Sequence, residues 1–352
     1  MNIKRPLFPS PPNSQLGPNS IGGSGNNLGG VGGAPVAFSA SVSVTPGQSG
    51  VNLNAVKLQS GFRRPYWVDE IRISMTTGLV AARPLWGVSG AIGLKFSTGS
   101  YSFSKDFIPA GLYAPRFQND YDLDIGSIPL GVANGYNVST VRWLLPKPLY
   151  MPAGDMIQAA ASFTSYTPFT AGGNVPVTVY VTYVGRDIAP GSPPPNVRNV
   201  PWVASVVKDA GTAYASYGNA LRNPFLTQWQ LQRFTSRSYS LMNDSGANIW
   251  FQEDGLADEG PYGVLPGASV VDELGYTEVQ MYDSVGYDIL REWTPIGLVF
   301  DTTRAAWTFN RALGPRQQIN LNMRHVTGLR TPAATDTFYS HVGVVGYREE
   351  RV

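Results

Sequence analysis

Apolar and polar residues alternate with a period of two in segments along the whole chain. The clearest is VPVTVYVTYV at 175–184, in which valine occupies every second position as far as Val181. Because successive side chains of a β-strand point to opposite faces, this alternation predicts strands with one buried face. In the first half of the chain the pattern also predicts strands at VAFSASVSV (36–44), WVDEIRISM (67–75), AIGLKF (91–96) and MIQAAASF (156–163).

The second half of the chain shows the same period-two alternation. Strands are expected at QWQLQRFTSRSYSLM (228–242), ANIWF (247–251), AAWTFN (305–310), QINLNM (318–323) and FYSHVGVVGY (338–347). These segments are rich in residues that suit a half-buried sheet, and 39 glycines and 28 prolines punctuate the chain. The expected fold class is therefore all-β. One segment departs from it, because the alanines of 202–221 favour a helix or a helical arm.

Two stretches of different composition divide the chain. Residues 1–35 contain IGGSGNNLGGVGG, which cannot bury enough apolar surface to offset the entropy of ordering it, so we expect a flexible N-terminal arm. Residues 189–201, with five prolines, are expected to form a linker, because proline cannot donate to a sheet ladder. A chain of 352 residues exceeds what one core usually supports. We therefore expect one domain at 36–188 and another at 202–352.

The two expected domains share short landmarks in the same order. FRRPYW (62–67) is echoed by LRNPFL (221–226), and in both an arginine lies two residues before a proline that an aromatic residue follows. This order favours an internal duplication over two unrelated β-domains that share ordinary turn chemistry. The paired landmarks are Arg63 and Arg222, Pro65 and Pro224, Trp143 and Trp307, and Gly185 and Gly346. We expect both tryptophans to fill a core rather than to stack on a ligand.

Composition excludes several classes of function. Charged residues make up 14% of the chain and the formal net charge is +2, so no strong positive field is available to bind nucleic acid through its phosphates. The absence of cysteine excludes disulfides, thiolate metal sites and a cysteine nucleophile. No apolar run approaches the roughly 20 residues of a membrane-spanning helix. The prolines that follow MNIKR do not suit a secretory signal peptide.

The residue types that carry catalytic chemistry form no recognisable motif. The two histidines, His325 and His341, lie in different expected strands, and the chain has no G-x-S-x-G, H-E-x-x-H or P-loop spacing. We expect each histidine to be a packing or surface residue. Neither enzymatic activity nor a cofactor is therefore expected.

Two acidic clusters are candidates for a cation site. Asp120, Asp122 and Asp124 alternate in DYDLDIG, which places three carboxylates on one face of an extended segment, although an ordinary exposed strand face has the same pattern. The cluster QEDGLADEG (252–260) lacks the ligand spacing of an EF-hand, and a solvated loop is expected there. The alternating aspartates are the better candidate.

A β-unit of about 150 residues with long loops suits a jelly-roll sandwich, and two in tandem suit a double jelly roll. With its short Pro-rich connector and Gly-rich arm, the chain resembles the double jelly-roll major capsid proteins of tailless icosahedral double-stranded DNA viruses, the tectivirus-like and adenovirus lineage. The resemblance covers residues 36–352. It implies two upright jelly rolls side by side in each subunit, and homotrimers that form pseudo-hexagonal capsomers.

The resemblance also implies a location and partners. The protein would be part of the virion of a bacteriophage or related virus, after assembly in the host cell cytoplasm. Its partners would be neighbouring capsomers, other capsid proteins such as a vertex or penton protein, and in some members an internal viral membrane. The arm carries Lys4, Arg5, Leu7 and Phe8 near its tip. A flexible linker of about 20 residues spans roughly 25 Å, so we expect this tip to reach an adjacent capsomer or an anionic lipid surface.

The function expected from the sequence is that of a structural major capsid protein, without direct specific nucleic-acid binding. Two alternatives remain open. A carbohydrate-binding or glycoside-cleaving double β-sandwich would stack exposed Trp and Tyr on sugars and use a pair of carboxylates. A phage spike or receptor-binding trimer would share the oligomeric state.

Overall fold

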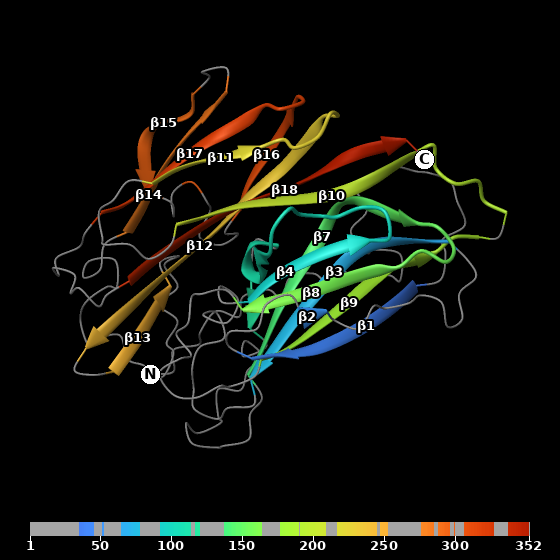
Figure 1. Cartoon of the computed structure of the whole chain (residues 1–352), viewed down its shortest axis with the longest axis horizontal. Helices are drawn as coiled ribbons and strands as arrows, with labels where there is room; N and C mark the ends of the chain where they lie inside the picture. The colour runs from blue at the N-terminus through green and yellow to red at the C-terminus, as the bar shows by residue number, and fades with distance from the viewer. Residues whose placement is uncertain are drawn as a thin grey trace, which may run out of the picture. The chain divides into compact units, whose positions relative to one another are not determined.

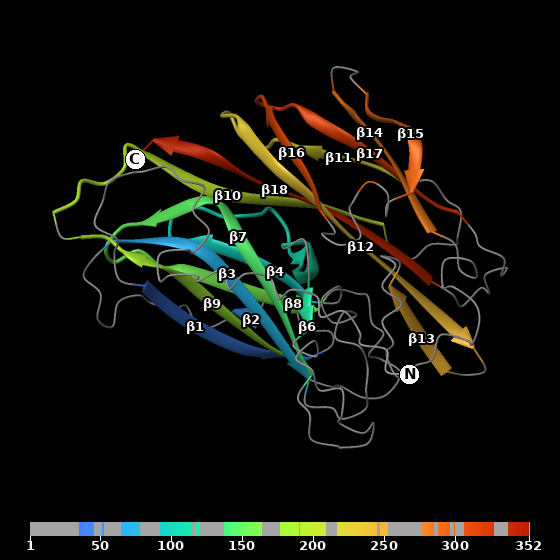
Figure 2. The same cartoon turned by 180° about the vertical axis from the view of Figure 1, so that it is seen from behind.

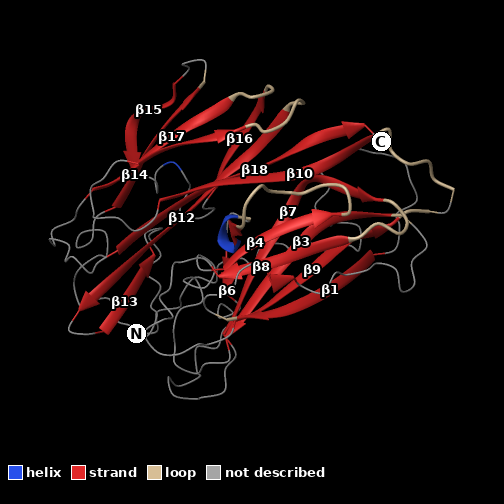
Figure 3. Cartoon of the chain, in the orientation of Figure 1, coloured by secondary structure: helices blue, strands red, loops and turns tan. Residues whose placement is uncertain are grey.

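The computed structural model of the chain describes residues 35–45, 51–52, 65–77, 92–113, 117–119, 137–163, 177–189, 191–208, 217–244, 247–252, 276–284, 288–295, 299, 306–326 and 337–351. Within these ranges the chain is almost entirely β-strand (Figure 3). The expected all-β fold is therefore confirmed. None of the helices in the described ranges has the length and hydropathy that a membrane span requires.

Several residues singled out from the sequence lie outside the described ranges. They are Lys4, Arg5, Leu7 and Phe8 of the arm, Arg63, the aspartates Asp120, Asp122 and Asp124, and the acidic cluster from residue 253 onward. Their roles stay predictions.

The first half of the chain forms two antiparallel sheets, coloured blue to green in Figure 1. Sheet A has the strand order β1-β9-β3-β7-β6 and sheet B the order β2-β8-β4-β5. The short 3-10 helix η1 (Ala110–Leu112) follows β5 directly. The strands of sheet A are β1 (Pro35–Val44), β9 (Val177–Asp187), β3 (Tyr66–Thr77), β7 (Asn137–Met151) and β6 (Phe117–Asn119); those of sheet B are β2 (Val51–Asn52), β8 (Ile157–Phe163), β4 (Ile92–Thr98) and β5 (Ile108–Pro109).

The second half forms two further sheets, coloured yellow to red in Figure 1. Sheet C has the order β10-β18-β12, and both β13 and β16 pair with β12; sheet D has the order β11-β17-β14-β15. The strands of sheet C are β10 (Val197–Lys208), β18 (Thr337–Arg351), β12 (Trp229–Asp244), β13 (Ala247–Gln252) and β16 (Ala306–Leu313); those of sheet D are β11 (Tyr217–Arg222), β17 (Gln318–Val326), β14 (Tyr276–Asp283) and β15 (Asp288–Pro295).

Both halves have the strand order of a jelly roll. If the main strands of each half are numbered along the chain, with the short β6 and the additional β13 left out, sheets A and C both have the order 1-8-3-6. Sheets B and D both have the order 2-7-4-5. The long strands β1, β9, β3 and β7 of sheet A can be followed in Figure 2. A repeated eight-strand order of this kind identifies two tandem jelly-roll sandwiches, as the sequence predicted.

Aromatic side chains fill the core of the first sandwich. Trp143 is fully buried, and its ring centroid lies 4.7 Å from that of Tyr113, 5.6 Å from that of Phe96 and 6.4 Å from that of Phe103. In the second sandwich the buried side chains that are described include Trp229 and Trp202. Such rings bury large apolar areas and so contribute much of the stability of a sandwich core.

The expected helix and part of the expected linker are strands in the structure. Strand β10 begins at Val197, inside the range 189–201, and continues to Lys208; β11 begins at Tyr217. Proline is compatible with β10 because this strand lies at the edge of sheet C, where Pro201 pairs with Tyr347 on one side only. Pairing with β18 thus overrides the helix propensity of the alanines.

Candidate functional site

The two sandwiches meet along a continuous surface, which we call the inter-sandwich interface. The hydroxyl of Thr235 on β12 donates a hydrogen bond of 2.8 Å to the carbonyl of Leu112 in η1. Arg233, on the same strand, donates from Nη2 to the carbonyl of Tyr113 over 3.0 Å. Gly343 on β18 leaves space for Leu112, because a Cβ added to this glycine would lie only 2.9 Å from the Leu112 Cβ. Burial lowers the pKa of Arg233 to about 10, which leaves it charged at neutral pH.

The apolar part of this interface is continuous with the core of the first sandwich. Val200 and Val203 on β10 and Val345 on β18 are fully buried, and they belong to the same hydrophobic cluster as Trp143. The backbone N–H of Val203 donates to the carbonyl of Phe103 over 2.7 Å. Each Å² of apolar surface that is buried contributes about 25 cal/mol, so such a contact is stabilised in the same way as a domain core. The two sandwiches are therefore one packed body rather than two domains on a flexible tether.

Arginines stack on aromatic rings at the rim of the inter-sandwich interface. The guanidinium carbon of Arg348 lies 3.8 Å from the ring centroid of Phe225 and 5.6 Å from that of Tyr101. The guanidinium carbon of Arg198 lies 5.4 Å from the Tyr101 centroid and 5.8 Å from the Tyr150 centroid. Cations over ring faces contribute roughly 0.5–2 kcal/mol each, more when they are desolvated. Tyr101 thus links two arginines of the second sandwich to the first.

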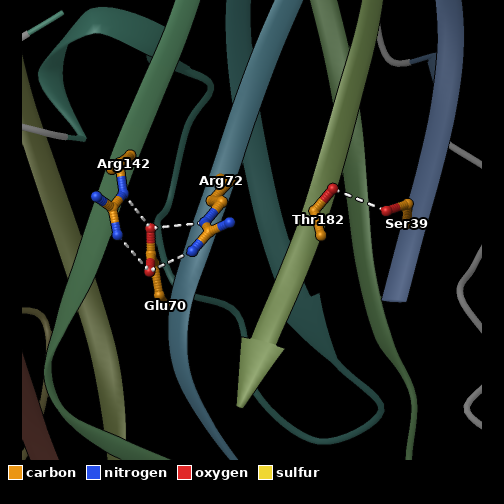
Figure 4. Close-up of polar contacts among 5 residues, drawn as sticks. All are labelled: Ser39, Glu70, Arg72, Arg142 and Thr182. Carbon is orange, nitrogen blue, oxygen red and sulfur yellow. Dashed lines mark hydrogen bonds and ion pairs between the residues drawn. The ribbon is translucent and has the colours of Figure 1, made fainter. Parts of the chain in front are cut away.

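A second polar cluster lies on the side of sheet A that faces away from the core, which we call the outer face of sheet A (Figure 4). The Glu70 carboxylate accepts from Nε of Arg142 at 2.7 Å and from Nε of Arg72 at 2.9 Å. Second bonds join its other oxygen to Arg142 at 3.1 Å and to Arg72 at 3.3 Å. The Glu70 side chain is only 3% exposed, whereas those of the two arginines are nearly half exposed.

This cluster keeps Glu70 ionised and leaves a net positive charge. Burial by itself raises the pKa of Glu70, but the hydrogen bonds and charges of Arg142 and Arg72 outweigh it, and the pKa lies below its ordinary value. The bonds to Glu70 also raise the pKa of Arg142. One carboxylate between two guanidinium groups leaves one positive charge in excess on an accessible sheet face.

Hydroxyl pairs continue the outer face of sheet A toward its edge. Ser39 on β1 and Thr182 on β9 share a hydrogen bond of 2.8 Å (Figure 4), and Ser43 and Thr178 share one of 2.9 Å. Larger side chains stand among them, with Tyr180 43% exposed and Leu144 54% exposed. The face therefore combines hydroxyls, one excess positive charge and accessible apolar surface, a mixture that suits a protein contact.

The paired landmarks lie on corresponding strands. Trp143 on β7 pairs with β3, and Trp307 on β16 pairs with β12, so each tryptophan is on the sixth main strand of its sandwich. Gly185 is on β9 and Gly346 on β18, the eighth strands. Trp143 is a core residue. None of the four takes part in the polar cluster on the outer face of sheet A.

The proline landmarks lie in the connections that lead to the third strands. Pro65 directly precedes β3, whereas Pro224 lies between β11 and β12. Arg222 is exposed, and the residue that organises this corner is Asn223, which is fully buried. Its amide nitrogen lies 2.9 Å from the carbonyl of Thr227. The sequence motif pointed to the residues on either side of this asparagine and missed it.

Among the described residues, both histidines are buried within strands of the second sandwich. His325 on β17 and His341 on β18 are buried, with 4% and 1% exposed surface. Burial lowers the pKa of His341 to about 3, so this histidine is neutral at physiological pH. Within the described ranges, no three of His, Cys, Asp and Glu are arranged to hold a metal ion.

No family model matches the chain, and no curated protein matches it. Solved structures of similar fold include virus capsid proteins. The PBCV-1 virus capsid has a TM-score of 0.49 and 10% identity, and the alignment covers 90% of this chain and 94% of that one. The STIV major capsid protein has a TM-score of 0.46 and 13% identity, with 90% and 97% covered. The major capsid protein P2 of bacteriophage PM2 has a TM-score of 0.39 and 8% identity, and the alignment covers 90% of this chain and 98% of that one.

Proposed function

We propose that this chain is the structural major capsid protein of an icosahedral virus. The observation that carries the proposal is the repetition of one jelly-roll strand order in two sandwiches that share a packed interface. We further propose that residues 1–35 form an arm, that the first jelly roll spans 36–188, and that the second begins with β10 after a short Pro-rich connector.

A rigid pair of like sandwiches suits a shell for a geometric reason. Three copies of the chain around a threefold axis present six sandwiches of the same strand order, which approximates a hexagon. Hexagonal units tile a surface without gaps. Repeated head-to-tail contacts form a closed ring when the rotation between neighbouring units closes. The shared core between Val203, Val345 and the first sandwich would hold the two units of each subunit at a fixed angle. Such a capsomer is a homotrimer.

The proposed partners follow from this role. They are further copies of the same capsomer, other capsid components such as a vertex protein, and a lipid layer where the virion has one. The arm, with Lys4, Arg5, Leu7 and Phe8 near its tip, would reach one of these surfaces. Two basic residues contribute only about 2 kcal/mol at an anionic membrane, so many arms in one shell would have to act together. The protein would be located in the virion and would have no catalytic role.

The proposal is tested by the size and assembly of the purified full-length protein. Sedimentation velocity should give a stable trimer of the 38.0 kDa chain. Electron microscopy should show hexagonal sheets or closed shells at high protein concentration. A monomer that stays dispersed at every concentration and is retained on a glycan column would contradict the proposal in favour of the carbohydrate-binding alternative.

The arm has its own test. Removal of residues 2–30 should leave the trimer intact and reduce the yield of shells. Shells of normal yield and stability from the shortened chain would show that the arm is dispensable.

A further inference from the structure

The two sandwiches of one chain contact each other through different surfaces. The first presents β5, η1 and β7, and the second presents the outer face of sheet C, formed by β10, β12 and β18. A contact between unlike surfaces of like units is heterologous, so it leaves one surface of each kind without a partner. In this chain these are the outer face of sheet A and the β15 side of the second sandwich.

The strand registers show which residues of the two outer faces correspond. β3 and β12 each have a register shift opposite a glycine of the neighbouring strand, and these two shifts are equivalent points in the two sandwiches. Counting the same number of residues along each strand from its shift shows that Arg72 in β3 corresponds to Thr235 in β12. The matching rows are Ser205, Gly343 and Thr235 in sheet C, and Ser39, Thr182 and Arg72 in sheet A (Figure 4). Leu112 covers the row in sheet C. In the row of sheet A, Ser39 and Arg72 are exposed.

The complementary surface of the second sandwich is exposed too. β5 is buried in the first sandwich, whereas its counterpart β15 has no buried residue and three exposed ones. The side chain of Glu292 is 87% exposed, that of Arg291 80% and that of Asp288 55%. The segment therefore carries one negative charge in excess, opposite in sign to the excess on the outer face of sheet A.

We propose that the outer face of sheet A is the docking site for the β15 side of the second sandwich of another copy of this chain. The contact would repeat between subunits the arrangement that the chain already makes within itself. This inference rests on the proposed trimer and names the surfaces that form it. Three copies of the chain contain six sandwiches, and each sandwich has one outer face and one β5 or β15 side. In a closed ring every outer face meets the β5 or β15 side of the next sandwich, so no surface is left without a partner.

The chemistry of the two contacts differs in a way that fits their roles. Within the chain the covered row consists of Ser205, Gly343 and Thr235, and a leucine packs on it as in a core. Between subunits the row contains Arg72 beside Glu70, and an acidic strand would meet it. Polar, charge-complementary contacts favour selective association of subunits that are folded beforehand.

Cross-linking tests the pair of surfaces directly, because the chain has no cysteine. Thr182→Cys places a thiol on the outer face of sheet A, and Glu292→Cys places one on β15. The full-length double variant, treated with a short bismaleimide, should give covalent dimers and trimers, and the two single variants produced together in one cell, so that mixed trimers form, should give dimers only. Each single variant alone is the control and should stay monomeric on a denaturing gel.

A charge substitution provides the second test. Leu144→Glu adds a negative charge, of the same sign as the excess on β15, to an outer-face residue that is 54% exposed, and Leu226→Glu is the matched control at a residue that is 81% exposed and lies elsewhere. The concentration at which the trimer dissociates should rise about tenfold or more for Leu144→Glu, as at a central interface residue, and stay unchanged for Leu226→Glu. Circular dichroism should show that both variants fold; if Leu144→Glu does not, Tyr180→Glu replaces it.

The outcomes separate this inference from the proposed function. If the wild type forms a trimer, the double variant gives no cross-links and Leu144→Glu leaves the trimer unaffected, the docking site is overturned and the capsid role stands. A wild-type protein that never forms a trimer would overturn both. Cross-links in the double variant together with weakened trimers of Leu144→Glu would support both.

Discussion

Gly185 and Gly346 occupy the same place in the two sandwiches, each opposite a register shift in the neighbouring strand. Gly185 pairs with β3 where that strand shifts, and Gly346 pairs with β12 where that one shifts. A Cβ at Gly185 would lie 1.8 Å from the carbonyl oxygen of Trp67, and one at Gly346 would lie 2.2 Å from that of Gln230. A β-bulge bends its strand, and here it brings two backbones so close that only glycine fits.

Replacement of either glycine by alanine should destabilise the protein strongly. We expect Gly185→Ala and Gly346→Ala each to lower the free energy of unfolding by about 3 kcal/mol, since the added methyl group meets backbone that cannot move aside. Urea denaturation measures the change. Gly218→Ala is the control, because its Cβ would meet the side-chain oxygen of Asn322, which can rotate away. Equal losses for all three variants would contradict the role assigned to the bulges.

The two sandwiches should unfold together. The inter-sandwich interface is continuous with the first core, so calorimetry of the full-length protein is expected to show a single transition. Leu112→Ala should cost about 3 kcal/mol by leaving a cavity between the sandwiches, and Thr235→Val about 1–2 kcal/mol by leaving the Leu112 carbonyl without its hydrogen bond. Two well-separated transitions in the wild type would show that the interface is weaker than its burial indicates.

The period-two pattern predicted many of the strands closely. The runs at 36–44 and 67–75 correspond to β1 and β3, and the run at 318–323 begins where β17 begins. Alternation works here because a sandwich strand has one buried and one exposed face. The two like domains were predicted on other grounds: the length of the chain, and landmark residues that recur in the same order in both halves.

There is a physical reason why the period-two pattern did not predict strand β7. β7 contains Pro146 and Pro148, yet it is a strand of 15 residues. In the pairing of β3 with β7, Leu149 lies opposite Val68 and Leu144 opposite Glu70. The four residues 145–148 therefore bulge out of the ladder, and a proline there breaks no ladder hydrogen bond. Such an irregularity depends on the partner strand and cannot be deduced from local sequence.

The polar cluster on the outer face of sheet A was also beyond the reach of the sequence. Glu70 and Arg72 lie two residues apart on a predicted strand and so share a face, but Arg142 is separated from them by 72 and 70 positions. Only the pairing of β3 with β7 sets Arg142 beside Arg72. The order of strands in the sheet, which is set by the whole core, therefore creates this surface.

Neutralisation of Glu70 should destabilise the first sandwich. Glu70→Gln leaves Arg72 and Arg142 as directly paired neighbours of like charge, and we expect a loss of roughly 2 kcal/mol in low salt, part of which salt should restore. The carboxyl has a lowered pKa in the folded state, so its contribution is present above its ordinary value of 4.5 and is lost as the pH falls below it. Glu349→Gln is the control: it removes an exposed pair with Lys147 at 3.6 Å and should change stability by less than about 1 kcal/mol. A salt-independent loss for Glu70→Gln would argue against repulsion between the arginines.

Protonation of His341 should contribute to acid unfolding. Burial lowers its pKa from the ordinary 6.5 to about 3 in the folded protein. Between these values the unfolded chain binds a proton that the native protein does not, so the free energy of unfolding falls as the pH drops, by about 1.4 kcal/mol per pH unit for one group. Urea denaturation of the wild type and of His341→Gln at several pH values from 6 to 4 measures the difference. The variant, which has no titrating group at this position, should show a slope that is smaller by about this amount, even if the substitution lowers its stability at every pH. Parallel curves for the two proteins would show that His341 takes up a proton in the folded state as readily as in the unfolded chain, and acid unfolding would then have to be assigned to the carboxylates.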